Sequence, residues 1–306
     1  MQPSVAQPRH RSLKSGENLA GWAFLSLNFI GYILFKLVPL FMALILSFSK
    51  WNFVVGFKGI QFIGLENYAK LFTDKVFQVS MINTLKYSFV MVPVAILLAL
   101  IVGSILNSHV YFKSSIRLAF YLPNISSMVA VSVVWMILFL PSYGPINTFL
   151  TSLGIDNPPR WLNASKTSLL SIIIVSVWQS LGYNIIIVLA GLQTIPVTLY
   201  EAAKIDGANA VQTFFRITIP SLSSTLFFLT MISFISSFQV FTPVQVMTQG
   251  GPGTSSSVIV YYIYTTAFQY NNIGYASSMS WVLFLLVFFF AAARMIWSKR
   301  NEKKFG

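Results

Sequence analysis

The sequence predicts an all-α integral membrane protein with six transmembrane helices. Three observations predict it: the composition, the length of the apolar stretches and the placement of the basic residues. The 306 residues are 56% hydrophobic and only 9% charged, and the mean hydropathy is +0.72. A soluble domain of this size is far less apolar. The chain contains no cysteine, which excludes disulfides and thiolate metal sites.

Six apolar stretches are each roughly 20 residues or longer, the length that a helix needs to cross a bilayer while satisfying its own backbone. They cover residues 19–48, 82–106, 116–140, 168–192, 222–247 and 276–297. The polar segment before the first stretch lacks the small-residue cleavage pattern of a signal peptide, so the first stretch is expected to be a retained span. An even number of spans places both termini on the same side of the membrane.

Lysine and arginine determine which side that is, because they favour the cytoplasmic ends of spans. With both termini in the cytoplasm, the basic residues inside are Arg9, Arg11, Lys14, Lys113, Arg117, Lys204, Arg216, Arg294, Lys299, Arg300, Lys303 and Lys304. Those outside are only Lys50, Lys58, Lys70, Lys75, Arg160 and Lys166. We therefore expect a cytoplasmic tail over residues 1–18, a six-helix domain over 19–298 with a cytoplasmic loop at about 193–221, and a cytoplasmic tail over 299–306.

The loops on the other side differ in character. Leu65, Tyr68, Leu71 and Phe72 form an amphipathic pattern that predicts a segment lying along the membrane surface. The loop over residues 248–274 begins with a glycine-rich turn and continues with tyrosine and β-branched residues. This second part is compatible with a short helix or with an interfacial hairpin.

Residues 201–220, EAAKIDGANAVQTFFRITIP, form the one long polar segment within the hydrophobic part of the chain. Good helix formers precede Gly207, and an apolar face with three- and four-residue spacing follows it until Pro220. The pattern predicts a short helix, a glycine turn and a second short helix. Neither helix can span a bilayer, and neither carries a catalytic set, so we interpret the segment as a docking surface for another protein.

Several kinds of chemistry are not supported by the residues. The chain has no Gly-Lys pair and therefore no phosphate-binding P-loop, so any ATP must be bound by another subunit. His10 and His109 lack partners at ligand spacing, so no metal site is expected. The basic residues bracket apolar segments rather than forming a stripe with aromatics, which argues against nucleic acid.

The predicted spans contain no aspartate or glutamate, whereas ion-driven carriers usually need an intramembrane carboxylate. Lys36 and Lys86 lie within spans, but both are close enough to an end to extend to the interface. An ion-coupled secondary sugar transporter acting alone is thus the disfavoured alternative.

Uncharged polar residues gather on faces of the fourth and fifth stretches. They are Ser176, Gln179, Ser180, Tyr183 and Asn184 in the fourth, and Ser233, Ser237 and Gln239 in the fifth. Serines at helical spacing also occur where two helices simply pack closely. Buried amide and phenol groups need hydrogen-bond partners, however, and sugar hydroxyls with rings that stack on aromatics would satisfy them. These residues are the predicted substrate pathway.

The polar segment resembles the EAA loop of binding-protein-dependent ABC importer permeases, which lies between the fourth and fifth of six spans. The matching residues are Glu201, Ala202, Ala203, Asp206, Gly207, Ala208, Phe214, Ile217 and Pro220. Further similarity to the carbohydrate branch, of the maltose and glycerol-phosphate permease kind, covers residues 62–68, 121–123 and 247–253. Ser224 departs from the pattern, since many relatives have a second proline there.

The resemblance implies the fold of a type I importer permease in a bacterial cell membrane. It also implies its partners: a second homologous permease, two ATPase subunits that bind ATP and Mg, and an extracellular or periplasmic binding protein that delivers a sugar. This chain would bind no cofactor and would not be an enzyme. The loop would be the coupling helix, with Glu201 pairing with a basic residue of the ATPase and Gly207 forming the turn. The sugar site of the maltose-type permease would fall near Ser176, Ser180, Tyr183, Ser233 and Ser237.

Alternatives remain at this stage for both role and substrate. A purely structural membrane scaffold predicts no ATP-dependent flux with any partner. Oligosaccharides, uronate fragments, disaccharides and glycerol phosphate all suit the scaffold. The spans have no arginine at midplane depth, which favours neutral or uronate sugars over a phosphate.

Overall fold

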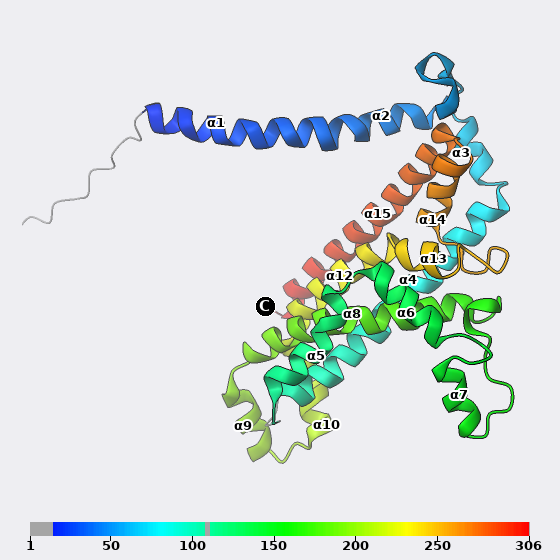
Figure 1. Cartoon of the computed structure of the whole chain (residues 1–306). Coiled ribbons are helices and arrows are strands. Elements are labelled where there is room, and N and C mark those ends of the chain that lie inside the picture. The colour runs from blue at the N-terminus through cyan, green and yellow to red at the C-terminus, as the bar shows by residue number, and fades with distance from the viewer. Residues whose placement is uncertain (1–14, 108–110, 306) are drawn as a thin grey trace, which may run out of the picture.

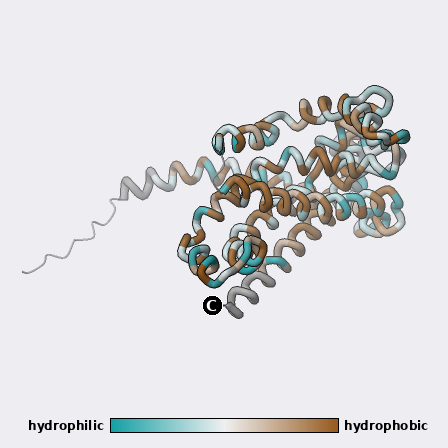
Figure 2. The backbone as a smooth tube through the Cα atoms, turned by 90° about the horizontal axis from the view of Figure 1, so that it is seen from below, coloured by the Kyte–Doolittle hydropathy of each residue, from teal (hydrophilic) through white to brown (hydrophobic). Residues whose placement is uncertain are grey.

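The computed structural model describes residues 15–107 and 111–305, and within these ranges the chain is a bundle of helices (Figure 1). Five helical segments in the described part are long and apolar enough to cross a membrane, and a bent helix pair makes a sixth. Hydrophobic residues cover the long helices over most of their length, and polar residues collect near their ends (Figure 2). The prediction of a six-span helical protein is confirmed.

The first span leaves the bundle. Helices α1 (Ser15–Tyr32) and α2 (Val38–Ser47) are joined by a π-helical turn, Ile33–Leu37, into one long rod. No residue between 21 and 45 is buried. Figure 1 shows this rod contacting the other helices only near the end of α2, where it packs on α15 (Ile273–Phe305). The apolar surface of α1 is therefore free to contact lipid or a second protein.

The centre of the bundle is the pair α4 (Lys75–Asn107) and α8 (Ser168–Gln193), which pack together along their length. Ala99 and Val188 are fully buried between them. At the same contact, a Cβ placed on Gly103 would lie 2.9 Å from a methyl group of Val188, so only glycine permits this approach. Close backbone approach at small residues is how helices associate where lipid supplies no hydrophobic driving force.

The third apolar stretch is not one helix, so the prediction of a continuous helix over residues 116–140 is wrong. The chain forms α5 (Lys113–Ile125) and α6 (Met128–Leu138), which meet at an angle of 99°. Ser126 and Ser127 separate them with extended backbone, at ψ values of 145° and 126°. The Ser126 hydroxyl donates to the carbonyl oxygen of Leu122 at 2.9 Å. Such local bonds compete with helix continuation, as serine side chains commonly do.

The fifth stretch also breaks, between α12 (Ser223–Phe238) and α13 (Thr242–Met247). Three residues, 239–241, link the two helices, and α13 then packs on α6 and α8. The last helix, α15, extends through the segment predicted as a tail over residues 299–306 as far as Phe305. Most of the predicted tail over residues 1–18 lies outside the described residues.

The loops at the end of the bundle that carries α3 (Glu66–Leu71) contain short ordered elements. Strands β1 (Ser49–Lys50) and β2 (Gln61–Phe62) pair antiparallel. In α3, Leu71 is buried in the core next to Tyr68, whereas Leu65 and Phe72 are exposed. The predicted surface segment is thus anchored on the bundle by one face. A further helix, α7 (Pro145–Ser152), lies in the loop before α8.

The segment with two interpretations, residues 258–268, is helical. It forms α14 (Ile259–Tyr264), followed by a π-helical turn, Thr265–Gln269. Asn83 holds the residues just before α14, donating from Nδ2 to the carbonyl oxygens of Thr254 and Ser257 at 3.0 Å each. Such hydrogen bonds fix the loop against α4, so no hairpin forms.

Candidate functional site

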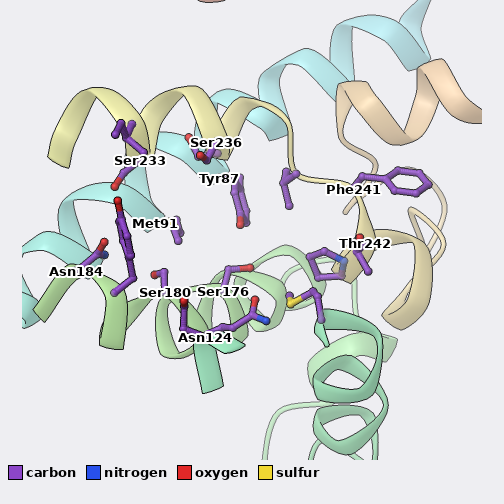
Figure 3. A pocket seen from close by; sticks show the side chains of 17 residues that line it. Tyr87, Met91, Asn124, Ser176, Ser180, Asn184, Ser233, Ser236, Phe241 and Thr242 are labelled. Atoms are coloured by element: carbon purple, nitrogen blue, oxygen red, sulfur yellow. The ribbon is translucent and has the colours of Figure 1, made fainter. Parts of the chain in front are cut away.

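A polar cavity of about 330 Å³ lies where α4, α8 and α12 meet the breaks between α5 and α6 and between α12 and α13 (Figure 3). The residues that line it are Tyr87, Met91, Asn124, Met128, Ser176, Gln179, Ser180, Tyr183, Asn184, Ile232, Ser233, Ser236, Ser237, Val240, Phe241, Thr242 and Pro243. None of these residues carries a charge. The two broken helices therefore leave room for a polar chamber inside an apolar bundle.

Seven of the eight residues predicted as the substrate pathway line this cavity together. They are Ser176, Gln179, Ser180, Tyr183 and Asn184 of α8, with Ser233 and Ser237 of α12. Gln239 does not line it; it lies in the break after α12 and is exposed. Helical spacing brings the seven to one place because α8 and α12 pack side by side.

The hydrogen bonds of the serines determine what they offer to a ligand. The Ser176, Ser180 and Ser237 hydroxyls donate to the carbonyl oxygens of Ile172, Val177 and Phe234, at 2.9, 3.1 and 2.8 Å. Each serine oxygen consequently remains as an acceptor. Asn184 is the opposite case: its side chain is only 2% exposed, and its Nδ2 has no hydrogen-bond partner. The cavity thus offers uncharged acceptors, while the Asn184 Nδ2 is enclosed by the protein.

Sequence reasoning missed the contributions of α4, α5 and α6. Tyr87 and Met91 reach the cavity from α4, and a side-chain hydrogen bond joins Tyr87 to Ser176. Asn124 and Met128 come from either side of the break between α5 and α6. Pro123 and the two serines after it were the available signal for that break, but they lie in a stretch whose hydropathy alone indicates one span.

The lysines within the spans do not take part. Lys36, in the π-helical turn of the first span, and Lys86, on α4, are both exposed and do not line the cavity. Their exposure agrees with the prediction that they extend toward an interface.

The predicted loop is a second candidate functional feature, and it lies at the end of the bundle where α8 stops. Helix α9 (Val197–Ile205) is followed by its C-cap, Asp206, and then by Gly207, which has a φ of +74°. The N–H of Ala208 donates to the carbonyl oxygen of Ala203 at 2.9 Å, and that of Gly207 to Lys204 at 3.2 Å. These two bonds define a Schellman turn, whose left-handed residue is most often glycine.

The second half of the loop begins with a capping box at Asn209. The Asn209 side chain accepts from the N–H of Gln212 at 2.8 Å, and the Gln212 side chain accepts from the N–H of Asn209 at 2.9 Å. Helix α10 (Ala210–Thr213) then continues through a π-helical turn, Phe214–Thr218, into α11 (Ile219–Ser221). Pro220 lies within α11, so it does not end the helical run as predicted. The run ends at Ser221, and Leu222 is its C-cap.

One face of the loop holds it to the bundle. Ala203 is buried, Phe214 packs against the core beneath, and the Tyr200 hydroxyl lies 3.2 Å from the hydroxyl of Thr218. The other face is open and carries Glu201, Ala202, Asp206 and the side chain of Ile205, which is 86% exposed. The loop thus leaves a face with apolar and charged side chains open, among them the exposed Lys204.

A separate polar cluster surrounds Asp74, at the end of the bundle that carries α3. Its carboxylate accepts from the hydroxyls of Tyr262 and Tyr275 at 2.7 Å each, and from the backbone N–H groups of Val76 and Phe77 at 2.9 and 3.1 Å. Burial acts to raise the pKa of Asp74, but these hydrogen bonds hold that pKa below its ordinary value. Burial and the nearby carboxylate raise the pKa of Tyr262. The cluster joins α4, α14 and α15 and lies apart from the cavity.

No group of three or more acidic or histidine side chains within metal-binding reach occurs among the described residues. His10 and His109 lie outside them.

Known proteins with similar sequence and structure agree with this architecture. Residues 89–306 match the family described as "Binding-protein-dependent transport system inner membrane component". The chain is 37% identical to the "Probable ABC transporter permease protein YesP" of Bacillus subtilis (strain 168), with 92% of this chain and 91% of that protein covered. It is 33% identical to the "Lactose transport system permease protein LacF" of Rhizobium radiobacter, with 92% and 95% covered.

A solved structure has the same fold. A chain of a bacterial alginate ABC transporter, in complex with an alginate pentasaccharide-bound periplasmic protein, superposes with a TM-score of 0.81 at 23% identity, covering 94% of this chain and 96% of that one. The resemblance found in the EAA-like loop and the multi-pass membrane location are thereby confirmed. The chain belongs to the family of inner membrane components of binding-protein-dependent transport systems, the ABC transporter permeases.

Proposed function

We propose that this chain is a permease subunit of an ATP-driven saccharide importer, with the polar cavity as its part of the substrate pathway. One observation carries the proposal: α8 and α12, which line the cavity, are the two helices that the loop of residues 194–222 connects. A force applied to the rigid loop is therefore transmitted directly to both walls of the cavity. Movement of one helical unit against another around a fixed site is a common transport mechanism.

The chemistry of the cavity supports a saccharide as the substrate. Serine oxygens accept, the Gln179 amide donates, and Tyr87, Tyr183 and Phe241 supply aromatic rings. A sugar ring presents hydroxyls that both donate and accept, together with an apolar face that stacks on aromatics. LacF and the alginate transporter, two of the similar proteins, handle saccharides by their names.

The loop supports the coupling to an ATPase. Its open face presents Glu201 and Ile205, and no partner within the described chain covers them. We assign this face, with Glu201, Ala202, Ala203, Asp206, Gly207, Ala208, Phe214 and Pro220 as its framework, to the groove of an ATPase subunit that binds ATP and Mg. With both termini and the loop in the cytoplasm, the Asp74 end faces outward, toward a solute-binding protein.

The unburied first span supports a second permease. Residues 21–45 form an apolar rod that packs on nothing in the described chain except near its end. A homologous permease would bury part of this rod and would close the cavity from the side that this chain leaves open.

ATP-dependent uptake by the assembled complex in proteoliposomes tests the proposal. We expect Glu201→Ala to lower uptake and substrate-stimulated ATPase activity while the complex still assembles, and Asp156→Ala, an exposed carboxylate in another loop, to leave both unchanged. If Glu201→Ala left both uptake and substrate-stimulated ATPase activity unchanged, the docking role would be contradicted. Gradient-driven uptake without any ATPase would favour an ion-coupled carrier acting alone.

A second pair of variants tests the cavity. Tyr183→Ala and Ser237→Leu are expected to lower uptake about fivefold to tenfold, because one removes an aromatic contact and the other fills the chamber. Ser115→Leu is the matched control, since Ser115 is exposed near the start of α5 and does not line the cavity. Normal uptake in both cavity variants would place the pathway elsewhere.

A further inference from the structure

Three consecutive apolar side chains are exposed at the tip of the hairpin that follows the first span. Phe53, Val54 and Val55 form a short 3₁₀ helix between the paired strands β1 and β2, and their side chains are 65%, 76% and 65% exposed. Figure 1 shows this hairpin projecting from the corner where α2 meets α15, clear of the other helices. We call these three residues the apolar tip. Contiguous exposed apolar side chains mark surfaces that bind a protein or a membrane.

The backbone N–H groups of the apolar tip are all bonded within the protein. The N–H of Phe53 donates to the carbonyl oxygen of Asn271 at 3.2 Å. Asn52 serves the other two: its side chain accepts from the N–H of Val54 at 2.9 Å, and its carbonyl oxygen accepts from that of Val55 at 3.2 Å. Lipid supplies no hydrogen-bond partner, so a segment that enters it must satisfy its backbone donors internally. The apolar tip meets this condition.

The hairpin is bonded to the protein at the level where two spans end. The carbonyl oxygen of Trp51, two residues before the apolar tip, accepts from the N–H of Ile273, the first residue of α15, at 3.1 Å. One candidate span, Ile273–Ile296, begins at this point, and another, Gly21–Ser47, ends shortly before the hairpin. The ends of spans lie at the membrane interface. The apolar tip therefore lies at the depth of the membrane surface.

The charges of the hairpin complement an anionic bilayer surface. Residues 48–65 contain two lysines and no acidic residue. The two lysines are Lys50, before the apolar tip, and Lys58, after it, and both are exposed. A lysine can lay its stem along apolar surface while its ammonium group stays among the headgroups, where it attracts anionic lipid. An apolar centre with cationic flanks is thus the pattern of an interfacial membrane anchor.

We propose that the apolar tip inserts into the bilayer interface, with Lys50 and Lys58 at the headgroups of anionic lipids. The occupant of this surface is lipid rather than another subunit. The tip thereby anchors the end of the first span that packs on α15, while the rest of that span extends away from the bundle. The inference goes beyond the proposed function and does not depend on which substrate is transported.

Collision accessibility of a spin label in the full transporter complex tests the insertion. This chain has no cysteine, so Val54→Cys introduces a single labelling site when the partner subunits are cysteine-free. In lipid nanodiscs, oxygen, which concentrates in hydrocarbon, is expected to relax this label more than an aqueous nickel chelate does. Asp156→Cys, exposed in the loop before α8, is the control and should show the reverse. A label at residue 54 that responds mainly to the nickel chelate, or to neither reagent because a subunit covers it, overturns the proposal.

A variant pair tests whether the apolar side chains drive the insertion. With the label moved to Val55→Cys, Val54→Asp should shift the label toward the nickel chelate, because a carboxylate resists entry into the bilayer. Val54→Leu, which keeps the apolar character, should leave the label accessible to oxygen. The same accessibility in both variants overturns insertion through the tip.

Lipid charge tests the two lysines. Adding phosphatidylglycerol to phosphatidylcholine nanodiscs should raise the oxygen accessibility of the label at residue 54. Replacing both lysines, by Lys50→Gln and Lys58→Gln, should abolish this increase. An increase that is absent in the original protein, or that persists without the lysines, overturns their assignment to anionic headgroups.

Discussion

Replacing Asp74 with alanine should destabilise the protein by about 3 kcal/mol. The carboxylate accepts two tyrosine hydroxyls at 2.7 Å, and such charge-assisted bonds contribute about 1.5 kcal/mol each at the low end of their range. It also caps α4 through the N–H groups of Val76 and Phe77, which contributes about 1 kcal/mol. Because Asp74 is partly exposed, water replaces some of these bonds, and the sum of about 4 kcal/mol is an upper bound.

Denaturant unfolding of the purified complex, followed by tryptophan fluorescence, measures this effect. Tyr262→Phe removes one of the two hydroxyls and should cost about 1 kcal/mol, and a double-mutant cycle with Asp74→Ala should show coupling between the two sites. The control is Asp156→Ala, because Asp156 is exposed and makes none of the hydrogen bonds described above. If Asp74→Ala were no more destabilising than this control, the cluster would not hold α4, α14 and α15 together.

The same carboxylate predicts a dependence on pH. Its pKa in the folded protein lies below the ordinary value of 3.8, so the unfolded state binds a proton more readily. The contribution of Asp74 is therefore fully present above about pH 5 and is lost as the pH falls through the folded pKa. Unfolding at pH 7 and pH 3 should show a larger loss in the original protein than in Asp74→Ala; equal losses would contradict the assigned hydrogen bonds.

Three further substitutions test particular contacts. Gly207→Ala should cost about 1 kcal/mol, because alanine is strained at a φ of +74°, and should lower coupled ATPase activity without preventing membrane insertion. The added Cβ would meet no other atom within 4 Å, so any effect would come from the backbone strain, and full activity would refute it. Gly182→Ala should separate α5 from α8, because its Cβ would lie 2.7 Å from the Cα of Tyr121, and should lower stability by about 1 to 3 kcal/mol in denaturant unfolding, an outcome that unchanged stability would exclude. Asn83→Leu removes both hydrogen bonds to the loop before α14, so hydrogen exchange at Ser257 should accelerate at least tenfold; unchanged exchange would show that other contacts hold the loop.

The local signals in the sequence predicted the loop and most of the cavity wall. Gly207 and the residues around it act through sequence neighbours, so a helix, a left-handed turn and a second helix follow from them directly. The serines of α8 and α12 share helix faces because of a fixed 3.6-residue period. Seven of the eight predicted residues consequently meet in one chamber, while Gln239 does not, because the helix ends one residue before it.

The features that the sequence did not predict depend on backbone direction or on distant partners. Hydropathy measures how apolar a stretch is and contains nothing about a change of direction within it, so the bend between α5 and α6 was missed. The Asp74 cluster joins side chains 188 and 201 residues apart, and no local pattern indicates such a pairing. Asn124 and Met128 were missed for the first reason, since they reach the cavity only because the helix breaks between them.

The break between α5 and α6 also explains why an apolar bundle can contain a chamber without charge. A continuous third span would satisfy all of its own backbone and would present only side chains to α8. The broken span instead brings Asn124 and Met128, from either side of the break, to the cavity. Because α6 also packs on α13, which follows α12, a shift of α8 and α12 driven from the loop would move the α6 N-terminus as well. If the cavity is the substrate pathway, substrate contacts at Asn124 and Met128 would be coupled to the loop through this packing, and substitutions there should change how strongly substrate stimulates the ATPase.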